Sequence, residues 1–105
     1  MSRRSIMAKT DPTLKRQLAA ARKSGESVEA VLTLRNDLSD APTPELTRKI
    51  ADEVLRRAEE SAGESADDFN VLGNLGMIVV AGSEPFIRAL LKAPEIESAA
   101  ANEEV

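Results

Sequence analysis

The last third of the chain places an apolar run, a helix start, a proline break and a second apolar run in close succession. The first run covers residues 75–81, and the helix start that follows it is Ser83-Glu84-Pro85. Pro94 blocks extension of this short helix, and the second run covers residues 96–101. This order predicts a strand–helix–strand unit, followed by an acidic tail at residues 102–105 that is free to reach a partner.

Two further helices are predicted by a capping residue followed by proline. Asp11-Pro12 starts a helix over residues 12–24, and Gly25 ends it. Thr43-Pro44 starts a second helix, which we expect to end near Gly63. Apolar residues recur along this second helix at the spacing of one buried face: Leu46, Ile50, Val54 and Ala58, with Ala51 and Leu55 beside them.

The remaining apolar segments predict strands. Residues 28–35 alternate, which is typical of a half-buried strand. Residues 69–72 form a second short strand, residues 73–74 a turn, and residues 36–41 a polar loop. The alternation in the first of these strands sets Val28, Ala30, Leu32 and Leu34 on one side and Glu29, Val31, Thr33 and Arg35 on the other.

The element order is therefore a helix followed by β-α-β-β-α-β. It predicts an α+β fold, a ferredoxin-like sandwich in which two helices cover one face of a four-stranded antiparallel sheet, with an extra N-terminal helix. We divide the chain into a disordered leader (1–10), an N-terminal amphipathic helix (11–25) and the ferredoxin-like domain (26–105).

The uncovered face of this sheet is the main functional signal. Residues 75–81 are apolar on both sides of the strand, since Met77 and Val79 lie on one side and Ile78 and Val80 on the other. Depending on register, Val31, Ala99 and Ala101 join the uncovered side. An apolar surface of this kind marks an interface. The alternative is that the N-terminal helix, through Leu14 and Leu18, covers the same face.

Composition excludes much catalytic chemistry. The chain has no cysteine and no histidine, so it lacks thiolate nucleophiles, the commonest metal ligand and the usual general base. The carboxylate pairs Asp67-Asp68 and Glu59-Glu60 are expected to be solvated charges, and the acidic loop at residues 36–40 does not suit an anion. We therefore expect no enzyme activity, no cofactor and no metal.

The net charge and the length of the apolar segments exclude nucleic acids and membranes as expected partners. Residues 1–35 hold eight Lys and Arg, but the net charge of −4 makes the rest of the chain acidic and unsuited to phosphate backbones. RNA binding through a sheet needs exposed aromatic residues, and Phe69 is instead expected to fill the core. No segment is long enough to span a bilayer and no secretory signal is visible, so we expect a cytoplasmic protein without nucleic-acid or membrane partners.

Several motifs resemble the closing half of subtilisin propeptides and their stand-alone inhibitor relatives. They are Asn74-Leu75-Gly76-Met77-Ile78-Val79-Val80, Ser83-Glu84-Pro85 and Leu90-Leu91-Lys92-Ala93-Pro94-Glu95-Ile96-Glu97-Ser98, and the likeness covers about residues 27–105. Met77 stands where that family has Phe. The resemblance implies a ferredoxin-like fold whose open sheet face docks on two surface helices of the protease, with the C-terminal tail in the active-site cleft like a product.

These observations predict a propeptide-like inhibitor or folding chaperone of a subtilisin-like serine protease. The alternative is a non-catalytic module that binds another protein, or pairs with itself as a homodimer, through a ferredoxin-like sheet. In either case the expected partner-binding residues lie on the uncovered face and, by the resemblance, in the tail: Val31, Met77, Val79, Asn102, Glu103, Glu104 and Val105.

Overall fold

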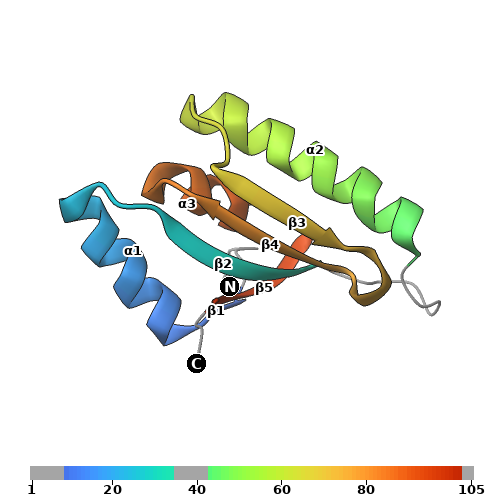
Figure 1. Cartoon of the computed structure of the whole chain (residues 1–105), viewed down its shortest axis with the longest axis horizontal. Helices are drawn as coiled ribbons and strands as arrows, with labels where there is room; N and C mark the ends of the chain where they lie inside the picture. The colour runs from blue at the N-terminus through green and yellow to red at the C-terminus, as the bar shows by residue number, and fades with distance from the viewer. Residues whose placement is uncertain (1–8, 35–42, 103–105) are drawn as a thin grey trace, which may run out of the picture.

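A computed structural model of the 105-residue chain describes residues 9–34 and 43–102. These described residues form a mixed α+β architecture with a five-stranded sheet and three α-helices (Figure 1). The elements in order are β1 (Lys9–Thr10), α1 (Pro12–Ser24), β2 (Val28–Leu34), α2 (Pro44–Ala62), β3 (Asp68–Leu72), the 3-10 turn η1 (Gly73–Leu75), β4 (Met77–Gly82), α3 (Glu84–Leu91) and β5 (Ile96–Ala101).

The helices begin where the sequence predicts them. The side chains of Asp11, Thr43 and Ser83 each accept a hydrogen bond from a backbone N–H of the first helical turn, and proline occupies one of the first positions of each helix. Gly25 and Gly63 adopt left-handed backbone conformations, with φ of 79° and 73°, and end α1 and α2. The predicted bounds of α1 are confirmed.

The sheet differs from the predicted four antiparallel strands. Its order is β1-β5-β2-β4-β3, in which β5, β2, β4 and β3 are antiparallel to their neighbours and β1 runs parallel to β5. Lys9 and Thr10, expected within a disordered leader, pair with Ser98 and Ala99. The N–H of Asp11 also donates to the carbonyl of Ala99 (2.9 Å). This short strand occupies backbone groups of β5 that would otherwise form an open edge.

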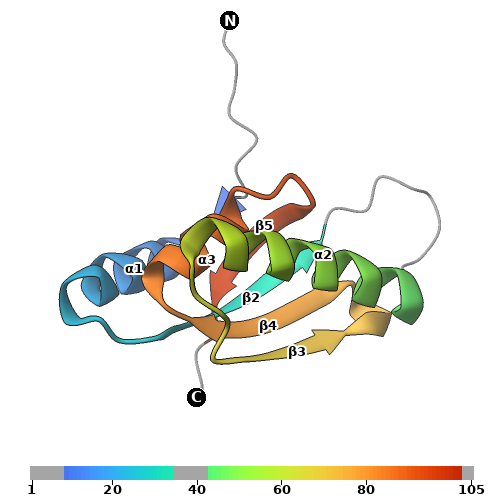
Figure 2. The ribbon, with the colours of Figure 1, turned by 90° about the horizontal axis from the view of Figure 1, so that it is seen from above.

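All three helices cover the same face of the sheet. Figure 2 shows the three helices on one side of the strands. Leu18 of α1, Val54 of α2 and Phe86 of α3 are at most 1% exposed and belong to one core with the inward side chains of β2 and β4. The N-terminal helix, predicted as a segment apart from the domain at residues 26–105, packs through its buried face into the common core. The inward strand residues at its centre are Ala30, Leu32, Ile78 and Val80.

Three apolar residues lie elsewhere than the sequence pattern predicts. Leu46 is 44% exposed and Thr47 is buried in its place, where the Thr47 hydroxyl donates to the carbonyl of Gly73 (3.0 Å). Leu75 belongs to the turn η1 rather than to β4 and is 63% exposed. Phe69 was expected in the core but is 45% exposed, because it lies on the edge strand β3. The predicted loop at residues 36–41 lies outside the described residues.

Candidate functional site

The sheet surface opposite the helices is formed by three rows of side chains. Cross-strand pairing aligns these rows across the strands, and every residue in them is exposed or half-buried. The first row contains Glu29, Ala81 and Asp68; the second contains Ala100, Val31, Val79 and Asn70; the third contains Lys9, Ser98, Thr33, Met77 and Leu72. These residues are referred to below as the open face.

The three predicted face residues lie together on this surface. Val31 and Val79 are direct cross-strand partners, and Met77 pairs with Thr33 in the next row. All three are half-buried, whereas Ile78 and Val80 on the other side of β4 are fully buried. The prediction that β4 is apolar on both sides is therefore confirmed. Its outward side supplies the apolar centre of the open face.

The alternative that α1 covers this surface is wrong. Leu14 and Leu18 are buried in the core on the helix side of the sheet, and α1 packs beside α3 there. Ala99 and Ala101, expected on the uncovered side, pair with the inward Leu32 and Ala30 and also face the helices. The residues of β5 that reach the open face are instead Ser98 and Ala100. A register irregularity between Thr33 and Leu34 accompanies this pairing.

Asn102 is the part of the predicted tail that the structure describes. Its backbone N–H donates to the carbonyl of Glu29 (3.1 Å), so it continues the pairing of β5 with β2. Asn102 therefore lies at the end of the first row of the open face. Glu103, Glu104 and Val105 lie outside the described residues.

Charged side chains occupy two opposite corners of the open face. Glu29 and Asp68 flank Ala81 in the first row, and they border a shallow hollow of about 220 Å³ whose floor includes Val79. Lys9 stands at the other corner, at the far end of the third row. Sequence reasoning did not identify these charges as part of the site. The alternating pattern of β2 places Glu29 on the same side as Val31, so Glu29 could have been identified from the sequence. Lys9 could not, because β1 has two residues and is too short to show an alternating pattern.

A second hollow of about 350 Å³ lies next to the open face, between α1 and the start of β2. Asn102 and Glu29 border it together with residues of α1, including Gln17 and Ala21. The Ser27 hydroxyl nearby donates a hydrogen bond to the carboxylate of Asp67, which ties the start of β2 to the segment before β3. Polar and acidic residues, among them Glu26 and Ser27, therefore line this hollow together with Asn102 and with apolar residues of α1 and β2.

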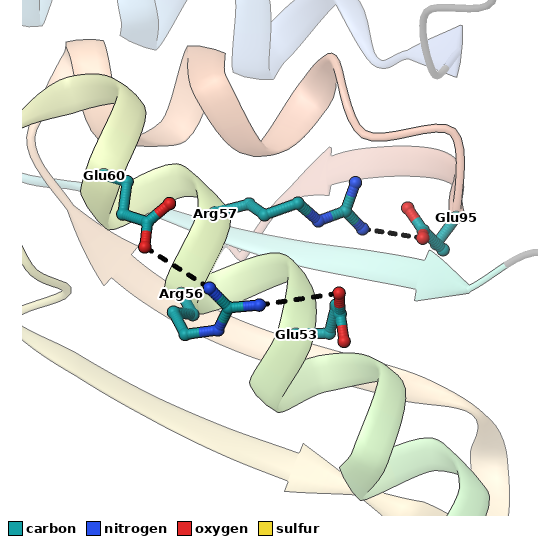
Figure 3. A network of polar contacts seen from close by, with 5 residues as sticks. All are labelled: Glu53, Arg56, Arg57, Glu60 and Glu95. Carbon is teal, nitrogen blue, oxygen red and sulfur yellow. Dashed lines mark hydrogen bonds and ion pairs between the residues drawn. The ribbon is translucent and has the colours of Figure 1, made fainter.

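A network of polar contacts involves α2, which lies on the helix side of the sheet (Figure 3). Arg56 contacts Glu53 (3.6 Å) and Glu60 (3.3 Å), while Arg57 reaches across to Glu95, with 2.6 Å between Nη2 and Oε2. The hydrogen bond to Glu95 raises the pKa of Arg57 above its ordinary value. Burial alone would raise the pKa of Glu95, but the Arg57 hydrogen bond and charge outweigh it and hold that pKa below its usual range. This pair ties α2 to the turn before β5.

Neither the network nor any other part of the described chain gathers three or more metal-ligating residues. Among the described helices, none has both the length and the apolar character needed to cross a bilayer. Comparisons of the chain with models of protein families, with curated proteins and with solved structures find no match.

Proposed function

We propose that this protein is a non-catalytic inhibitor or folding chaperone of a subtilisin-like serine protease, acting in the cytoplasm. It binds the protease through the open face and through residues 102–105, which enter the active-site cleft like a cleavage product. In this proposal the fold is ferredoxin-like, with β1 and α1 as additions. The antiparallel order β5-β2-β4-β3, with α2 and α3 as crossovers on one face, supports this assignment.

The centre of the open face suits a protein surface. Val31, Val79 and Met77 present half-buried apolar side chains with no charge between them, and Thr33 and Ser98 beside them are small and uncharged. A patch of this composition loses little hydration when a partner covers it, and its apolar area favours association. Within residues 9–34 and 43–102, the helices lie on the other side of the sheet and do not cover this surface.

The position of Asn102 carries the proposal. Because the Asn102 N–H donates to the Glu29 carbonyl at the end of the first row, Asn102 lies beside the open face. A partner that covers Val31 and Val79 therefore has the start of the tail next to it. Binding of an extended tail in a protease cleft uses main-chain hydrogen bonds, which require few particular side chains.

The test is inhibition of a panel of purified subtilisin-like proteases by four forms of the protein. They are the wild type, a form lacking residues 102–105, Val79→Lys and the control Ser61→Lys, which adds the same charge to an exposed position of α2. We expect inhibition by the wild type and by Ser61→Lys. Val79→Lys should bind about 30-fold more weakly, the effect of losing one central contact.

The truncated form separates the two parts of the site. Loss of residues 102–105 should abolish competition with substrate while leaving some binding through the open face. In parallel, refolding of protease domains without their propeptides measures chaperone activity. If the wild type neither inhibits nor accelerates refolding of any protease in the panel, the proposed function is wrong.

A further inference from the structure

We infer that the open face also pairs with the open face of a second copy of this chain. The two copies are related by a two-fold axis at Val31, and Lys9 of each copy meets Asp68 of the other. The inference rests on the positions of these three residues in the sheet. It does not require a protease.

The register of the five strands places Val31 midway between the two charged corners. Lys9 lies on β1, at one edge of the sheet, and Asp68 lies on β3, at the other edge, with β2 as the middle strand. Lys9 also belongs to the third row and Asp68 to the first, so the second row lies between them. A diagonal line across the open face joins Lys9 to Asp68. Val31, on the middle strand and in the middle row, lies at the midpoint of this line.

This placement makes the open face complementary to itself. A two-fold axis that passes through Val31, in the plane of the face and perpendicular to the diagonal, exchanges the two corners. Each lysine then lies against an aspartate, and the contact occurs twice, as an isologous interface requires. Like charges at the two corners would instead repel in this arrangement, so the opposite signs favour a second copy as the occupant.

The rest of the face permits close stacking. Val31, Val79 and Ala100 in the second row have short side chains, which suit two sheets packed about 10 Å apart. The same rotation turns Glu29, the second carboxylate of the open face, toward Ala100 and Asn102 of the other copy. The Glu29 carboxylate therefore faces the side-chain amide of Asn102 rather than another acidic group.

The size of the face sets the expected strength of the pairing. Five strands and three rows span roughly 25 Å by 20 Å, or about 500 Å² on each copy. The two copies together bury about 1,000 Å², the lower limit for a specific interface. We therefore expect a reversible dimer that forms in the micromolar range and dissociates on dilution.

Pairing covers Val31, Val79 and Met77, which the proposed function assigns to the protease. If that function holds, the dimer is a resting form in which two copies protect each other's binding surface, and a protease competes with the second copy. This consequence rests on the proposed function, whereas the pairing itself does not.

The test measures self-association of the purified protein alone by sedimentation equilibrium over a wide concentration range. The wild type should form a dimer, and Val31→Lys should remain monomeric. Lys9→Glu and Asp68→Lys should each weaken dimerisation on the order of tenfold, because both symmetric contacts become repulsive. The matched controls are Lys15→Glu and Glu64→Lys, which reverse exposed charges away from the open face and should dimerise like the wild type.

Mixing the two charge-reversed variants gives the decisive measurement. In a mixed dimer, Lys9 of one chain meets Asp68 of the other, and the introduced glutamate meets the introduced lysine, so dimerisation should recover. Unfolding of either variant cannot produce this recovery. A wild type that stays monomeric, or a dimer that neither reversal weakens, would overturn the inference. Failure to recover in the mixture would overturn it as well, while protease inhibition is scored separately.

Discussion

Replacement of Leu18 by alanine tests whether α1 belongs to the core or lies over another part of the molecule. Leu18 is 1% exposed and packs in the same core as the inward residues of β2 and β4. Truncation removes buried methyl groups and leaves a cavity, which costs about 2–5 kcal/mol at such sites. A domain of this size is stable by about 5–15 kcal/mol, so the loss is a large part of the total.

The matched control is Leu46→Ala, the same substitution at a helical position that is 44% exposed. It should change the free energy of unfolding by no more than about 0.5 kcal/mol. Because the chain has no Trp or Tyr, urea unfolding is best followed by far-ultraviolet circular dichroism. Leu18→Ala should lower the midpoint of a single transition with an unchanged denaturant slope. Equal effects of the two substitutions, or a separate early transition in the wild type, would refute the placement of α1 in the common core.

Two further predictions concern contacts away from the open face. The pKa of Glu95 lies below its usual range, so its ionised form adds stability above about pH 4.5, which is lost as the pH falls through the lower folded-state value. Glu95→Gln should therefore flatten the fall of the melting temperature in acid, and an unchanged acid profile would contradict the role of Arg57. Gly73→Ala should destabilise the protein by about 1–3 kcal/mol, since a Cβ there would lie 2.8 Å from the Cα of Pro44. A melting temperature equal to that of the wild type would show that α2 and η1 pack less tightly than described.

The helices could be predicted closely because their signals are local. Each start combines a side chain that accepts a backbone N–H with a proline that needs no partner, and both effects act within one turn. The inward side of β2 was likewise visible, because Ala30 and Leu32 alternate with residues that face outward. In these segments the local preference and the final packing agree.

The errors concern residues whose place depends on distant parts of the chain. Lys9 and Thr10 form a strand because they pair with the edge of β5. Two residues are too few to show the alternating pattern by which a strand is predicted. The sequence around Ala99 and Ala100 is nearly uniform, so only pairing with β2 decides which alanine faces the helices. Phe69 is apolar, but its position on an edge strand leaves it half exposed.

The same distinction applies to the candidate site. Val31, Met77 and Val79 could be predicted because alternation along single strands places them on the outward side. The charged corners could not, since the relation between Lys9 and Asp68 arises from the order of five strands. Sequence reasoning therefore found the apolar centre of the open face and missed its charge pattern.

The position of β5 between β1 and β2 has a consequence for synthesis on the ribosome. While the chain emerges, β1 has no strand to pair with, and β2 lacks one neighbour until β5 has left the exit tunnel. Leu14 and Leu18, which end up in the common core, have no complete surface to pack against during that interval. The nascent protein therefore lacks a complete core until β5 is made, and a chain stalled before Ile96 should be recognised by chaperones or proteases.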